Sequence, residues 1–112
     1  MKKDNEIYLR HILDAIILIK SYIHGATFES FQNNMILQDA VIRRLQIIGE
    51  AVRQLSEDFR NHYPNIPYGE ILGMRNRITH DYLGVVLEIV WEVVQQDLPK
   101  LELEIQTILN KE

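Results

Sequence analysis

The chain has 112 residues, 46% of them hydrophobic and 25% charged, which indicates one ordinary globular domain with little room for a second module and argues against disorder beyond the termini. It contains no cysteine, which excludes disulfide bonds and thiolate metal sites and favours a reducing cytoplasm. Its formal net charge of −4 excludes a protein that coats nucleic acid, so any contact with nucleic acid must be local.

The first predicted element is a helix from about Asp4 to His24. Its segment Ala15–Ile19 is apolar in almost every direction around the axis, which fits either a central position in a tight bundle or a partner surface. The segment is too short to span a bilayer, and the N-terminus lacks the cleavage pattern of a signal peptide. We therefore expect a cytoplasmic protein without membrane contacts.

A second, long amphipathic helix is predicted by apolar residues that recur in steps of four and three. These residues are Leu37, Val41, Leu45, Ile48, Val52, Leu55 and Phe59. Within this helix, Gly49 would let a neighbouring helix approach closely, and Glu50 could pair with Arg75.

A shorter helix is predicted from near Pro67 to near Gly84, after a loop over residues 61–67. The last helix carries an apolar stripe of Leu87, Val90, Trp91, Val94, Leu98, Leu101, Ile105 and Ile108. Pro99 should kink or divide this helix. Strand signals are nearly absent, so the sequence predicts an all-α, up-and-down four-helix bundle.

The short helix carries the pattern R-x4-H-x-Y, formed by Arg75, His80 and Tyr82, with Asn76 beside the arginine. At about 100° per residue, Arg75 and His80 diverge by about 140° on a regular helix. One substrate could meet both only where the helix frays near Gly84 or where two copies of the helix face each other. This geometry favours a composite site across a homodimer.

These residue types suit the cleavage of an RNA phosphodiester. His80 could take the proton from a ribose 2′-hydroxyl or protonate the leaving 5′-oxygen, and Arg75 could stabilise the charged phosphate. Asn76 could orient His80 or hold the phosphate. The internal 2′-hydroxyl nucleophile makes a metal or cofactor unnecessary for this route. On spacing alone, an exposed polar helix end with Asn76 and His80 in contact is favoured.

The string Gly73-Met74-Arg75-Asn76-x3-His80-x-Tyr82 resembles the signature of the HepT-like family within the HEPN superfamily. Other segments agree with it in order and position: Ile47–Ala51, Ile66-Pro67, Ile89–Trp91 and Asp97–Leu101. The resemblance runs from about Asp4 to Leu101, so residues 1–112 are interpreted as a single HEPN/HepT-like domain.

The resemblance implies a dimeric, metal-independent endoribonuclease that is the toxin of a toxin–antitoxin module. Its partner would be a nucleotidyltransferase antitoxin of the MntA type, which silences the toxin by transferring AMP from ATP onto Tyr82. By position, Arg75 and His80 would be catalytic, with Asn76 and Glu50 supporting them. RNA, with a structured tRNA end as an example, is the expected substrate, and DNA is not expected.

Two other hypotheses stay open at this point. The first is a catalytically idle helical binding module that docks to the nucleotidyltransferase and presents its substrate. The second is a purely structural dimerisation domain, which would explain the helices but not the polar cluster. The sequence favours the enzyme because Arg75, Asn76, His80 and Tyr82 are all present.

Overall fold

The computed structural model describes residues 1–80 and 85–111, and these ranges contain helices and no strand. The elements are α1 (Lys3–Tyr22), α2 (Phe28–Gln32), α3 (Met35–Gln54), α4 (Glu57–His62), α5 (Tyr68–His80), α6 (Leu87–Glu92), the π-helical segment η2 (Val93–Asp97) and α7 (Leu98–Lys111). The predicted all-α class is confirmed. Among the described residues, no helix is both long and apolar enough to cross a bilayer.

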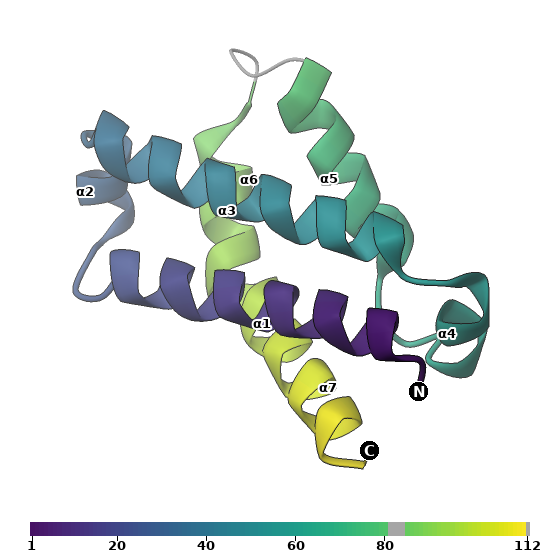
Figure 1. Cartoon of the computed structure of the whole chain (residues 1–112). Helices are drawn as coiled ribbons and strands as arrows, with labels where there is room; N and C mark the ends of the chain where they lie inside the picture. The colour runs from purple at the N-terminus through teal and green to yellow at the C-terminus, as the bar shows by residue number, and fades with distance from the viewer. Residues whose placement is uncertain (81–84, 112) are drawn as a thin grey trace.

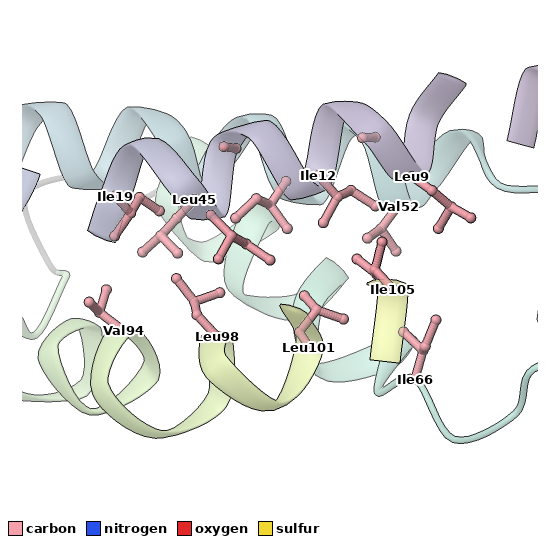
Figure 2. Close-up of a cluster of buried hydrophobic side chains, with 14 of the residues drawn as sticks. Leu9, Ile12, Ile19, Leu45, Val52, Ile66, Val94, Leu98, Leu101 and Ile105 are labelled. Atoms are coloured by element: carbon pink, nitrogen blue, oxygen red, sulfur yellow. The ribbon is translucent and has the colours of Figure 1, made fainter. Parts of the chain in front are cut away.

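Helix α3 lies between α1 and α5, and the segment from α6 to α7 crosses behind them and packs against α1 (Figure 1). Helices α1, α3 and α5 thus form one layer and the segment from α6 to α7 forms the other, and the hydrophobic core fills the space between them. In Figure 2, Ile12 and Val52 of the first layer point toward Leu98 and Leu101 of the second. The amphipathic stripes predicted for the two long helices therefore face the same core.

The apolar segment of α1 is only partly buried in the single chain. Ile16 and Ile19 have no exposed surface, whereas Ile17 and Leu18 are 48% and 37% exposed. Burial at the centre of the bundle therefore does not account for Ile17 and Leu18, and the alternative of a partner surface stays a prediction for this segment.

The predicted second helix is divided into α3 and α4, although its stripe of apolar residues continues across the division without interruption. Helix α3 ends at Gln54, Leu55 is extended, and α4 begins with Ser56 as its cap, whose Oγ accepts a hydrogen bond from Phe59 N at 3.1 Å. Asn5 of α1 is 5% exposed, and its Oδ1 accepts from Ser56 N at 3.1 Å. These polar bonds satisfy free amides at the helix start and stabilise the break.

The sequence predicted a kink or division of the last helix at Pro99, and the structure has an irregular segment in the turn before this proline. Segment η2 is π-helical, and α7 begins at Leu98, so that Pro99 lies in its first turn. Proline has no N–H to donate to the carbonyl four residues earlier, and its ring would collide with that carbonyl. The wider π-helical turn accommodates both constraints.

The start of α5 is anchored to the end of α3, close to the predicted position at Pro67. The Tyr68 hydroxyl donates to Tyr63 O at 2.7 Å, and the Arg60 guanidinium lies 5.4 Å from the centre of the Tyr68 ring. Arg60 Nη2 also donates to Val52 O at 3.0 Å, near the last turn of α3. Burial of the phenol raises the pKa of Tyr68 to about 12, against the opposing effect of Arg60.

Helices α3 and α5 meet along an antiparallel row of contacts, which we call the α3–α5 seam. The contacts are Gln46 with Thr79 and Gly49 with Arg75, and one turn further along α3 Arg53 lines a hollow together with Leu72 of α5. Each step forward along α3 is matched by a step backward along α5. The central contact is the tightest, because a Cβ atom built on Gly49 would lie 2.6 Å from Arg75 Cγ. The prediction that Gly49 permits close helix approach is confirmed.

We predict that Gly49→Ala destabilises the fold by about 1–3 kcal/mol, because the added methyl group meets the base of the Arg75 side chain and not its flexible end. The matched control is Gly73→Ala in α5, where nothing lies within 4 Å of the new Cβ. Because alanine favours a helix over glycine, the control should be neutral or stabilised by up to about 1 kcal/mol. Urea unfolding measures both, and equal effects would contradict the steric role of Gly49.

Candidate functional site

Arg75 is fixed at its base and open at its tip. Its Cβ and Cγ pack against Gly49, and its buried Nε has no hydrogen-bond partner within residues 1–80 and 85–111. Its Nη1 donates to Asn76 Oδ1 at 3.1 Å. The remaining donors of the guanidinium are left for an anionic ligand, with the planar geometry that suits phosphate.

A row of polar contacts ties the last turn of α5 to α3. Thr79 Oγ1 donates to Arg75 O at 2.9 Å and accepts from Gln46 Nε2 at 3.3 Å. The Gln46 carbonyl oxygen accepts in turn from Arg43 Nη1 at 3.1 Å. These contacts hold the turn that immediately precedes His80. They were not predicted, because the sequence alone does not reveal which residues of α3 and α5 lie opposite each other.

His80 is exposed at the end of α5, and α5 stays α-helical as far as this residue. The side chains of Arg75 and His80 therefore diverge by about 140°, as expected for a regular helix. Asn76 lies one turn before His80, and its Oδ1 accepts a hydrogen bond of 3.1 Å from Arg75. Within the described residues, no hydrogen bond joins Asn76 to His80.

Glu50 and Tyr82 complete the set of residues singled out in the sequence. Glu50 is half-buried and makes no ion pair with Arg75 in the described part of the chain. It instead lines a hollow of about 200 Å³ on the α1 side, together with Tyr8 and His11. The pairing of Glu50 with Arg75 that the sequence allowed is therefore not formed. Tyr82 lies outside the described residues.

Arg75 and Asn76 line an open hollow of about 380 Å³ between α3 and α5, and His80 does not line it. The other lining residues are Arg53 and Leu72. The hollow thus offers two guanidinium groups and an amide, and no carboxylate from the described part of the chain belongs to its lining. Sequence reasoning missed Arg53 as a member of the site. Its spacing of four residues from Gly49 was the available signal, since such residues share a helix face.

A family model described as "Ribonuclease HepT-like" matches residues 12–108. The chain is 47% identical over 111 residues to "Gamma-glutamylcyclotransferase and putative RNase" of Methanocaldococcus jannaschii, covering 99% of this chain and 50% of that protein. It is 40% identical to "Putative RNase" of Caldanaerobacter subterraneus subsp. tengcongensis, covering 94% of each chain. It is 39% identical to "Probable ribonuclease HepT" of Thermococcus cleftensis, covering 91% of this chain and 93% of that one.

The chain therefore spans half the length of the first relative and more than nine tenths of the other two. No solved structure matches it. The family model covers most of the chain, including α3, α5 and the residues of the α3–α5 seam. The chain belongs to the ribonuclease HepT-like family.

Proposed function

We propose that this chain is a metal-independent endoribonuclease that acts as the toxin of a toxin–antitoxin module. The proposal is supported mainly by the geometry of Arg75. The base of its side chain packs against Gly49, and the residue lines an open hollow that also contains the guanidinium of Arg53. The exposed imidazole of His80 lies on the next turns of the same helix. Names of relatives that include RNase and ribonuclease HepT support RNA as the substrate class.

The proposed reaction is an internal transfer of the phosphodiester. The imidazole of His80 takes the proton of the ribose 2′-hydroxyl, whose oxygen attacks phosphorus. The bond to the 5′-oxygen breaks, that oxygen takes the proton from the His80 imidazolium, directly or through a water molecule, and a 2′,3′-cyclic phosphate remains on the other product. Arg75 binds the non-bridging oxygens and stabilises the charge that gathers on them. Asn76 holds the Arg75 guanidinium through its hydrogen bond.

The active form is proposed to be a homodimer of up-and-down four-helix bundles of the HEPN type. Arg75 and His80 of one copy diverge on a regular helix, so the second copy must supply one of them. Exposed apolar residues are available for such an interface. Leu18 of α1 is 37% exposed, and Met35 and Ile36 in the first turn of α3 are 75% and 83% exposed.

Regulation is proposed to act on Tyr82, two residues after His80 in the sequence. A nucleotidyltransferase antitoxin of the MntA type would transfer AMP from ATP to the phenolic oxygen. The new bond joins that oxygen to the α-phosphorus, pyrophosphate leaves, and the phenol loses its proton. The added group would bring bulk and negative charge to a position two residues after His80 in the sequence, and both would oppose the binding of an RNA phosphate. Both proteins would act in the cytoplasm, with tRNA as the first candidate substrate.

A second candidate function is a binding module that presents a substrate to the nucleotidyltransferase without cleaving RNA itself. One observation favours it: the hollow that contains Arg75 does not include His80 in the single chain. The two functions differ in whether dimerisation completes a catalytic site.

We predict that the purified protein cleaves cellular RNA in excess chelator and leaves 2′,3′-cyclic phosphate ends. His80→Ala should lower the rate by at least about 100-fold, because it removes the general acid–base group. His24→Ala is the matched control, since His24 is also exposed but lies beyond the end of α1. Equal cleavage by wild type and His80→Ala would contradict the role of His80. If wild type, His80→Ala and His24→Ala all fail to cleave RNA, and mass spectrometry shows that Tyr82 is unmodified, the binding module would be favoured.

Mixing two inactive variants tests the composite site. If each site takes Arg75 from one copy and His80 from the other, Arg75→Gln and His80→Ala chains should complement each other in mixed dimers. Half of the dimers would be mixed and each would hold one intact site, so activity should recover to about a quarter of wild type. The chains are unfolded and refolded together before the assay. No recovery from verified mixed dimers would place both residues of a site in one chain.

We predict that incubation with the nucleotidyltransferase and ATP adds AMP to Tyr82 and abolishes RNA cleavage, because the new phosphate repels the substrate. Intact-mass and peptide mass spectrometry identify the modified residue. Tyr82→Phe should stay unmodified and should not be silenced by this route, whereas Tyr22→Phe should behave as wild type. Transfer of AMP to Tyr82→Phe would show that another residue is the acceptor.

A further inference from the structure

We infer that the hollow between α3 and α5 binds the RNA phosphate next to the one that is cleaved, and that Arg53 is its ligand. This inference rests on the proposed ribonuclease function, which assigns Arg75 to the scissile phosphate. Arg53 is exposed on α3, and it lines the hollow opposite Leu72, Arg75 and Asn76. The three residues of α5 share one helix face, because they are spaced by three and four positions.

The charge of the hollow is unbalanced. Among residues 1–80 and 85–111, its lining holds the guanidinium groups of Arg53 and Arg75 and no carboxylate, although the whole chain has a net charge of −4. Glu50, one turn before Arg53, lines the separate hollow beside α1. In the described ranges, no ion pair neutralises Arg53. Two like charges that line one hollow attract the successive phosphates of an RNA strand to it.

The backbone of Arg53 is held in place by hydrogen bonds from Arg60. Arg60 Nη2 donates to Arg53 O at 3.2 Å and to Val52 O at 3.0 Å, which fixes the last turn of α3. No hydrogen bond from the Arg53 side chain occurs within the described residues. A fixed backbone with an unengaged guanidinium lowers the entropic cost of binding a phosphate.

The order of residues along the α3–α5 seam indicates which phosphate Arg53 would bind. The seam begins near His80 with Gln46 and Thr79, continues at Arg75, and ends at Arg53. Arg53 lies one helical turn, about 6 Å along the axis, beyond the contact of Gly49 with Arg75. An RNA strand that follows the seam therefore meets Arg75 at the scissile phosphate and Arg53 at its neighbour.

A ligand for the neighbouring phosphate binds the ground state and the transition state alike. Its loss should raise KM and leave kcat nearly unchanged, because the chemical step takes place elsewhere. This behaviour separates Arg53 from Arg75, which contacts the phosphate where charge develops and whose loss should lower kcat.

The test measures binding of a fluorescently labelled single-stranded oligoribonucleotide to full-length chains that carry His80→Ala, by anisotropy over a series of salt concentrations. Adding Arg53→Gln should weaken binding roughly tenfold at low salt, as expected for loss of a charged hydrogen bond. The slope of log K against log salt should become shallower by about 0.7. Arg53→Lys should retain most of the slope. In chains with His80 intact, Arg53→Gln should raise KM and change kcat by less than about twofold.

The charge-matched control is Arg10→Gln on α1, whose exposed arginine pairs with Glu6 one turn away and lies outside the hollow. Thermal unfolding verifies that every variant is folded. The inference is overturned if Arg53→Gln and Arg10→Gln give the same affinity and salt slope, or if Arg53→Gln lowers kcat without raising KM. RNA cleavage without an Arg53 effect would refute this site alone, whereas an Arg53 effect on binding without cleavage would refute the proposed catalysis alone.

Discussion

The contact between Gly49 and Arg75 is the constraint on which the rest of the site depends. A glycine at this point lets α5 pack directly on α3, and the base of Arg75 fills the space that a side chain would occupy. The close approach also sets the register that brings Gln46 opposite Thr79 and places Arg53 beside Leu72. The absence of a side chain at Gly49 therefore fixes both the position of the Arg75 guanidinium and the hollow beside it.

In the single chain, the candidate phosphate-binding and proton-transfer groups lie on different sides of α5. Arg75 and Asn76 face the hollow, while His80 stands on another side of the same regular helix. In the proposed homodimer these groups would come from different copies, so an isolated chain would not combine them. The same interface would bury the exposed apolar residues Ile17, Leu18 and Ile36, which would offset the cost of association.

Helical periodicity predicted the apolar faces well and the helix ends poorly. The stripe of α3 continues through Leu55 and Phe59, both of which are buried, so the pattern gave no sign of the break between them. The break depends on Ser56 and on Asn5, which lies 51 positions away in the sequence. By contrast, the irregular helix before Pro99 was predictable from the local sequence. Proline lacks an N–H and has a bulky ring, and both disturb the helix that contains it.

The sequence by itself determined the all-α class, the core-facing residues of the long helices, the need for a small residue at Gly49 and the family signature around Arg75 and His80. These properties are carried by local spacing and residue type. Only the tertiary structure decided that Glu50 turns away from Arg75, that Thr79 is tied to Gln46 and that Arg53 joins the hollow. These depend on the register between two helices, which is set by side-chain packing between residues distant in the chain.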